Sequence, residues 1–215
     1  MNLYQEKYLS SKFHVAVDCI VFGYENKKLK ILLCKRMLEP AMGEYSLMGG
    51  WINDTETVEQ AAERVLLQIT GLKDKNLEMV GVFSDPGRDP GGRVISVVFY
   101  AMIRIDKHDR ELVEKHGAEW WSFEKRPKLI FDHDEMIEMA HNKLKEKANS
   151  EIIGKKLLPS RFTIFQLRTL YEAILQSKID PANFRKKVLL SEILEKQTEK
   201  NKTESKKGAF YYRFR

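Results

Sequence analysis

The chain has 215 residues, of which 43% are hydrophobic and 32% charged, with only 12 glycines and 6 prolines, which excludes a disordered or fibrous protein. Residues 151–215 contain 15 Lys and Arg against 7 Asp and Glu, whereas residues 1–150 contain 22 against 24. The net charge of +6 therefore lies at the C-terminal end and favours two domains, which we place at residues 1–150 and 155–215.

The first 130 residues predict a series of strands rich in β-branched and aromatic residues. The strands are expected at 13–23, 29–35, 44–52, 77–84, 93–104 and 119–123. One stretch, from Thr55 to about Thr70, instead has apolar residues at helical spacing. Gly71 is the residue type that commonly follows the C-terminus of a helix, so we expect that helix to end there.

The C-terminal third predicts helices joined by a linker. A helix is expected over 132–148, with His133 as a feature of its start, and the polar stretch 149–160 reads as a linker. Thr163-x-x-Gln166 is a capping box that opens a second helix. Asp180-Pro181 starts a third helix, with an N-cap followed by proline at the first helical position. Two short strands are expected at 193–197 and 209–214.

The stretch Gly50–Leu72 carries the spaced motif G-x5-E-x7-R in a strand–loop–helix–loop context. It resembles the Nudix box, whose full pattern is G-x5-E-x7-R-E-U-x-E-E-x-G-U, with U a bulky aliphatic residue. The residues in register are Gly50, Glu56, Arg64, Leu66, Gly71 and Leu72. The resemblance implies the α/β (α+β) class and a Nudix α/β/α sandwich with a mixed sheet.

In active Nudix hydrolases the glutamates after the Arg bind Mg²⁺ or Mn²⁺, which carries the diphosphate substrate and activates water. The matching positions of this chain are Val65, Gln68 and Ile69. At about 100° per residue these three share one helix face, from which Glu59 and Glu63 point away. Aliphatic and amide side chains do not supply the charge that a hard dication needs. We therefore expect no metal, no cofactor and no enzyme activity.

A second resemblance covers nearly the whole chain. The segments that carry it, in family order, are FSDPGRDPGGRVISVVFYA, EWW, LIFDHDEMIEMAHNKL, LLPSRFTIFQLRTLYEAI, DPANFRKKVL and YYRF. They resemble bacterial Nudix-related transcriptional regulators, in which a Nudix sensor domain precedes a small winged helix-turn-helix domain. The resemblance implies a homodimeric repressor that binds double-stranded operator DNA and is released by a small effector.

The helix that follows Asp180 has the pattern of a recognition helix. Phe184 and Val188 occupy one face, and the other face offers hydrogen-bond donors for base edges and phosphates. The basic loop after it would lie along the phosphates as a wing, although a solvated basic hairpin is the alternative. The residues expected to contact DNA are Asn183, Arg185, Lys186, Lys187, Lys200, Lys202, Lys206 and Lys207.

The cleft of a Nudix domain is the expected effector site. Our candidates are Trp51, Glu56, Arg88 and Arg93. The two arginines can bind an anion or a sugar hydroxyl, and the indole can stack on a ring; loop solvation and core packing are the alternatives. Glu56 and Arg64 can also simply hold the loop and the helix together.

Our sequence-based hypothesis is a cytoplasmic DNA-binding repressor that senses a pentose such as arabinose or an ADP-ribose-like nucleotide. Loss of the metal face favours the sugar. We expect a soluble protein without a membrane partner, because no apolar run is long enough to span a bilayer and the start lacks the apolar run of a secretory signal. Two alternatives stay open. One is a Nudix hydrolase of ADP-ribose or another nucleoside diphosphate derivative, using acids such as Glu56; the other is an adaptor whose basic tail binds an acidic protein.

Overall fold

The computed structural model describes residues 13–72, 77–203 and 208–215. Within these residues the N-terminal part forms one seven-stranded sheet, with the order β3-β2-β1-β6-β5, β4 beside β1 and β7 beside β2. Its strands are β1 (His14–Glu25), β2 (Lys28–Lys35), β3 (Tyr45–Ser46), β4 (Met48–Trp51), β5 (Glu78–Phe83), β6 (Val94–Met102) and β7 (Ala118–Ser122). The sheet is mixed, because β1 runs antiparallel to β2 and parallel to β6.

The first two strands form a hairpin, whose turn is shorter than the gap between the strands expected at 13–23 and 29–35. β1 extends to Glu25 and β2 begins at Lys28, so only Asn26 and Lys27 separate them. These two residues have positive φ angles of 52° and 61°. Two consecutive left-handed residues match the twist of the flanking strands, which explains why the pairing continues up to the turn.

The single strand expected over 44–52 is wrong, because this segment forms β3 and β4, which pair with different neighbours. β3 pairs with the end of β2, whereas β4 pairs with β1 over Ala16–Cys19. β2 covers β1 only from Val21 onward. The segment therefore leaves β2, turns inward at the buried Leu47, and fills the edge of β1 that β2 leaves open.

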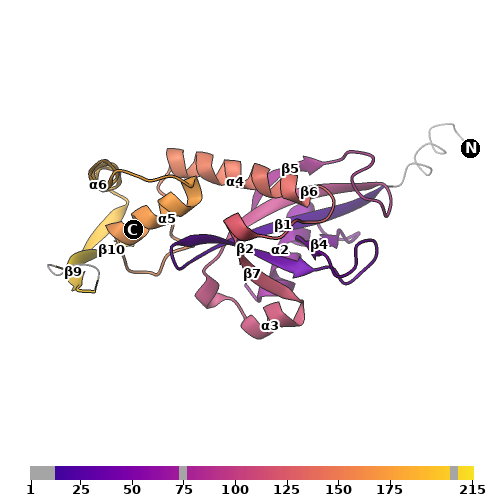
Figure 1. The fold of residues 1–215 in the computed structure, drawn as a ribbon, viewed down its shortest axis with the longest axis horizontal. Helices are drawn as coiled ribbons and strands as arrows, with labels where there is room; N and C mark the ends of the chain where they lie inside the picture. Colours follow the sequence, from indigo (N-terminus) through magenta and orange to yellow (C-terminus); the bar gives the residue numbers. More distant parts are fainter. Residues whose placement is uncertain (1–12, 73–76, 204–207) are drawn as a thin grey trace, which may run out of the picture.

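Helices cover both faces of the sheet (Figure 1). α2 (Val58–Thr70) packs on one face and α4 (His133–Ser150) on the other. α2 begins later than expected because Thr57 caps it, in a reciprocal capping box with Gln60, and it ends at Gly71 as predicted. The sequence does not predict the short helices, which have few buried positions: η1 (Ile105–Lys107), α3 (Arg110–Lys115) and η2 (Phe123–Lys125).

The C-terminal part contains two helices and a small sheet with the strand order β8-β10-β9. Its elements are β8 (Phe162–Thr163), α5 (Ile164–Leu175), α6 (Pro181–Leu190), β9 (Leu194–Asn201) and β10 (Ala209–Phe214). The capping box at Thr163 and the N-cap at Asp180 are confirmed. Two features differ from expectation: the two-residue β8 is not predicted, and β9 runs past the predicted end at 197. The fold class is confirmed: an α/β/α sandwich with a mixed sheet, followed by a small winged helix-turn-helix.

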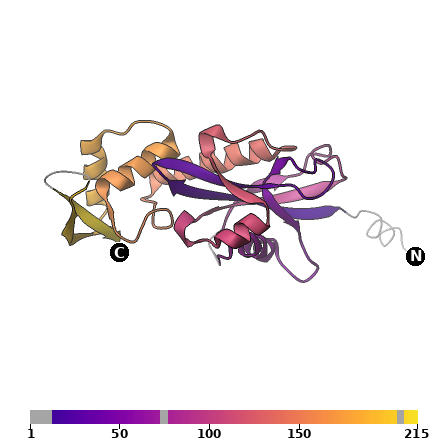
Figure 2. The same ribbon diagram turned by 60° about the horizontal axis from the view of Figure 1, so that its bottom comes forward.

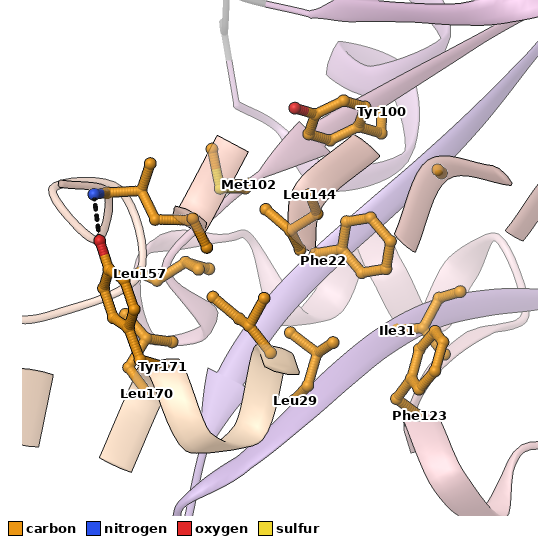
Figure 3. Packing of buried hydrophobic residues seen from close by; sticks show 14 of the residues in the cluster. Phe22, Leu29, Ile31, Tyr100, Met102, Phe123, Leu144, Leu157, Leu170 and Tyr171 are labelled. Atoms are coloured by element: carbon orange, nitrogen blue, oxygen red, sulfur yellow. Dashed lines mark hydrogen bonds between the residues drawn. The ribbon is translucent and has the colours of Figure 1, made fainter. Parts of the chain in front are cut away.

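One apolar cluster continues from the sheet into the C-terminal part (Figure 3). It includes Phe22 of β1, Leu144 of α4, and Leu170 and Tyr171 of α5. The dashed line in Figure 3 marks the hydrogen bond that the Tyr171 hydroxyl accepts from the backbone N–H of Ile153 at 2.8 Å. The linker and α5 are thus packed against the sheet domain.

The molecule is elongated, with the C-terminal part at one end of the sheet domain (Figure 2). α4 and the tip of the β1–β2 hairpin lie at the junction of the two parts. Among the helices that the described residues form, none has the length and apolar character needed to cross a membrane.

Candidate functional site

A cavity of about 400 Å³ opens on the sheet domain, between the loop that follows β2 and the start of α4. Its lining includes Asp18 of β1, Trp51 of β4, Arg88 of the loop before β6, and His133 of α4. A concave surface in which a few polar groups converge among apolar side chains is the usual form of a small-molecule site.

Two of the four predicted effector residues, Trp51 and Arg88, line this cavity. The Trp51 side chain is 54% exposed, which leaves its ring accessible for stacking. Arg88 is buried and donates to both carboxylate oxygens of Asp132, from Nε at 2.7 Å and from Nη2 at 2.8 Å. This bidentate pair fastens the loop before β6 to the start of α4, so Arg88 also shapes the wall of the cavity.

The other two predicted effector residues, Glu56 and Arg93, are not among the residues that line the cavity. Arg93 donates to the backbone carbonyl of Ser84 at 2.8 Å. Glu56 accepts from Nε and Nη2 of Arg64, and from the backbone N–H of Asn53 at 2.8 Å. These hydrogen bonds lower the pKa of Glu56 to about 2. The ionised Glu56 therefore holds the loop against α2, the structural role that the sequence suggests.

The structure shows the burial of the three α2 residues that stand where a Nudix hydrolase carries its metal ligands. Val65 and Ile69 are buried against the sheet, whereas Gln68 is exposed at the edge of that face. No group of three or more His, Cys, Asp or Glu side chains in the described part of the chain is placed to hold a metal ion. Two buried aliphatic side chains and an exposed amide do not fit Mg²⁺ or Mn²⁺, which require oxygen ligands.

The polar floor of the cavity is the feature that sequence reasoning missed. Asp18 is 7% exposed and accepts a hydrogen bond from Ser96 Oγ at 2.5 Å. His133 begins α4, as predicted, but it also faces the cavity. Burial lowers the pKa of His133, which favours the neutral ring. A lone carboxylate within the apolar run of β1 is the signal that would have pointed to Asp18, because a buried charge needs a partner or a function.

A second candidate surface lies on α6. Phe184 and Val188 are buried, while Asn183, Arg185 and Lys186 are exposed, as the helical spacing predicts. This helix therefore packs on one side and presents donors on the other, the arrangement that base and phosphate contacts require.

Lys187 is exposed as well, but its Nζ donates to the backbone carbonyl of Asn149, at the end of α4, at 3.1 Å. Arg185 borders a hollow of about 380 Å³ between α6 and β10, together with Arg168 and Phe210. Arg168 belongs to α5 and donates to Glu172 at 2.6 Å, so its guanidinium is already paired within the domain.

Two of the four lysines predicted to form a basic wing, Lys200 and Lys202, are described at the hairpin of β9 and β10. Lys200 lies within β9 rather than in a loop, with Nζ 4.5 Å from the centre of the Phe210 ring. Nζ of Lys196, a residue not predicted to contact DNA, lies 3.7 Å from the centre of the same ring. Lys202 is exposed just beyond β9. The predictions for Lys206 and Lys207 fall outside the described residues.

Comparison with known families yields two matches. Residues 12–140 match the NUDIX domain, and residues 154–214 match the NrtR DNA-binding winged helix domain. Together these two matches cover the cavity and the basic surface described above.

Three known proteins illustrate the similarity. The ADPR responsive transcriptional repressor NtrR of Acinetobacter baylyi is 29% identical over 93% of this chain and 81% of the repressor. The ADP-ribose pyrophosphatase of Methanocaldococcus jannaschii is 41% identical over 57% of this chain and 70% of the enzyme. The crystal structure of Shewanella oneidensis NrtR complexed with a 27mer DNA has a TM-score of 0.82 and 27% identity, covering 94% of this chain and 93% of that chain.

The NUDIX domain of the Shewanella protein has also been solved in complex with ADP ribose. That structure has a TM-score of 0.57 and 25% identity, and it covers 67% of this chain and 99% of the solved domain. The comparisons therefore include both a DNA complex and a nucleotide complex of one similar protein.

Proposed function

Because the chain belongs to the NUDIX family and joins its NUDIX domain to an NrtR DNA-binding winged helix domain, we propose that it is a sequence-specific transcriptional repressor whose NUDIX domain senses a small metabolite. In this proposal residues 1–150 bind the effector and form a homodimer, and residues 155–215 bind operator DNA. The effector class is an ADP-ribose-like nucleotide, since the similar repressor of Acinetobacter baylyi is named as ADPR responsive. A free pentose, which the loss of the metal face favours, is the second effector class.

The observation that carries the proposal is the two-sided character of α6. Its apolar side chains Phe184 and Val188 are buried in the cluster that continues into the sheet domain, and Asn183, Arg185 and Lys186 are exposed. The basic β9–β10 hairpin lies in the same domain and supplies sequence-independent attraction to phosphate. A helix of this kind beside a basic wing fits duplex DNA better than an acidic protein partner, which would not need base-reading donors.

The proposal is tested by binding to duplex DNA from the chain's own upstream region, followed by fluorescence anisotropy. We expect affinity for that duplex to exceed affinity for a scrambled duplex by about a thousandfold or more. Raising salt from about 50 to about 200 mM should weaken binding by orders of magnitude, and ADP-ribose or arabinose should release the DNA. Equal affinity for both duplexes, or DNA binding that neither compound changes, would contradict the proposal.

A second candidate function is hydrolysis of ADP-ribose, favoured by the identity to the Methanocaldococcus pyrophosphatase. The side chains at positions 65, 68 and 69 argue against it, because they do not fit a divalent ion. Incubating the protein with ADP-ribose and either Mg²⁺ or Mn²⁺ decides between the two functions. Release of AMP that depends on the cation and is abolished by Glu56→Gln would support the enzyme.

A further inference from the structure

The floor of the cavity presents one carboxylate oxygen that is kept open. Oδ2 of Asp18 accepts the hydrogen bond from Ser96, which leaves Oδ1 on the side of Gly49. A Cβ at position 49 would lie only 2.5 Å from Oδ1, so any residue other than glycine would fill the space above this oxygen. Asp18 and Gly49 are direct partners in the pairing of β1 with β4, which fixes this arrangement.

The opposing group is the imidazole of His133. Its Nδ1 accepts a hydrogen bond from the backbone N–H of Leu47 at 3.1 Å, so the proton of the neutral ring is assigned to Nε2. Nε2 lies 4.0 Å from Oδ1 of Asp18. This separation is too long for a direct hydrogen bond. An N–H donor and a carboxylate acceptor therefore face each other across a gap that one oxygen atom can bridge.

We propose that Asp18 and His133 together bind a hydroxyl group of a sugar ring, and that formation of this contact changes the placement of the DNA-binding domain. The inference rests on the proposed effector-sensing function and deepens it. A hydroxyl is both donor and acceptor, so it can donate to Oδ1 and accept from Nε2 at once. A phosphate oxygen only accepts, and the Asp18 carboxylate would repel it. Lys35 and Arg36, which also line the cavity, are the groups suited to a phosphate.

Both residues lie on elements that reach the DNA-binding domain. β1 continues from Asp18 to Tyr24, whose hydroxyl donates to Oγ1 of Thr169 in α5 at 3.0 Å. α4 starts at His133 and extends for 18 residues, about 27 Å, to the junction (Figure 1).

Along α4, Nε2 of His141 lies 2.7 Å from the carbonyl oxygen of Ile174 in α5. At the end of α4, the carbonyl of Asn149 accepts from Nζ of Lys187 in α6. A ligand that bridges Asp18 and His133 fixes the placement of β1 relative to α4, and these contacts pass that placement to α5 and α6. Only a ligand with different affinity for the two placements can shift the equilibrium between them, which a bridging hydroxyl provides.

The test uses the full chain and one substitution at each of the two residues. Asp18→Asn removes the carboxylate charge. His133→Asn keeps an oxygen that can accept from the Leu47 N–H but removes the Nε2 donor. Asp54→Asn, in the exposed loop before α2, is the matched control. The probes are ADP-ribose and L-arabinose, which separate a nucleotide-borne ribose from a free pentose, and circular dichroism confirms that each variant is folded.

We expect both cavity variants to bind the active probe at least about tenfold more weakly in calorimetry, because Asp18→Asn loses a hydrogen bond to a charged group and His133→Asn leaves the hydroxyl without its buried N–H donor. Both should bind operator DNA within about twofold of wild type when no effector is present, yet fail to release it when the effector is added. Asp54→Asn should behave as wild type in every assay.

Unchanged probe affinity in both cavity variants would overturn this inference while leaving the proposed repressor intact. If wild type binds operator DNA but neither probe, both the effector assignment and this inference fail. If wild type binds no DNA at all, the proposed function fails, whereas weakened probe binding in the variants would still support the hydroxyl site.

Discussion

The hydroxyl group of Tyr24 lies 3.0 Å from Oγ1 of Thr169 and donates a hydrogen bond to it. Tyr24 belongs to the hairpin of the sheet domain, and Thr169 belongs to the first helix of the DNA-binding domain. Thr169 in turn donates to the carbonyl of Gln166 at 3.0 Å, so its hydroxyl is committed as an acceptor toward Tyr24. Tyr24 is therefore the donor and Thr169 the acceptor in this hydrogen bond, which lies at the junction between the two domains.

Tyr24→Phe should weaken the communication between the domains without abolishing DNA binding. The variant loses one hydrogen bond at the junction, and we expect unfolding in urea to become easier by about 0.5–1.5 kcal/mol. Effector-induced release of operator DNA should require more ligand than in wild type. Tyr45→Phe is the control, because the Tyr45 hydroxyl bonds Glu119 within the sheet domain. Equal effector response in wild type and Tyr24→Phe would contradict this role for the contact.

Asn183→Ala should reduce the discrimination between operator and scrambled DNA by about 1–3 kcal/mol, because an exposed amide on α6 can form hydrogen bonds with a base edge.

Lys186→Ala should instead weaken binding to both duplexes alike and lower the slope of log affinity against log salt by about one, as expected for a phosphate contact. Anisotropy titrations at several salt concentrations measure both effects. Lys115→Ala, on the exposed side of α3, should change neither quantity. A reversed pattern would assign the two roles the other way round.

The stability contributed by Glu56 should depend on pH. Arg64 and the Asn53 N–H lower the pKa of Glu56 from 4.5 to about 2, so the ionised form stabilises the folded state at every pH above about 4.5. This contribution is lost as the pH falls from there toward 2. The difference in Tm between wild type and Glu56→Gln should therefore be largest near pH 7 and shrink below pH 4. Glu124→Gln, on the exposed surface, should show no such trend, and a difference that grows in acid would refute the assignment.

Leu170→Ala should destabilise both domains in one step. Leu170 is fully buried in the cluster that extends from the sheet into the C-terminal part. Removing a buried leucine typically costs about 2–5 kcal/mol, because a cavity remains. Circular dichroism and tryptophan fluorescence should report the same lowered transition. Leu190→Ala, whose residue is 71% exposed, should stay within about 0.5 kcal/mol of wild type. Two separate transitions, with only one of them shifted, would contradict the shared core.

Local patterns predicted the elements whose causes are local. The capping box at Thr163, the N-cap at Asp180 and the left-handed Gly71 all act within a few residues, and each lies where the sequence indicates. The division of 44–52 into two strands could not be predicted from the sequence, because it depends on which part of β1 is left without a partner after β2 has paired. α3 was missed since a single buried residue, Val113, gives no periodicity.

The candidate sites divide in the same way. The exposed side of α6 follows from helical spacing alone, so the exposure of Asn183 and Lys186 is predictable, while their contacts with DNA stay a prediction. The floor of the cavity combines Asp18 and His133, which are far apart in the sequence and meet only because α4 starts above β1. Glu56, a predicted effector residue, forms an ion pair with Arg64, as the spacing of the two residues suggests. That this pair lies outside the lining of the cavity depends on the tertiary structure and could not be predicted from the spacing.

The apolar cluster shared by the two parts has a consequence for how this chain can evolve and be engineered. The C-terminal domain shares its hydrophobic core with the sheet domain, so it is not expected to fold when it is excised or fused to another sensor domain. Cleavage of the chain at the linker would expose an apolar surface on each fragment, and we expect both fragments to aggregate. In the proposed regulation, effector binding is then expected to tilt two packed domains slightly, rather than to move the DNA-binding domain about a flexible linker.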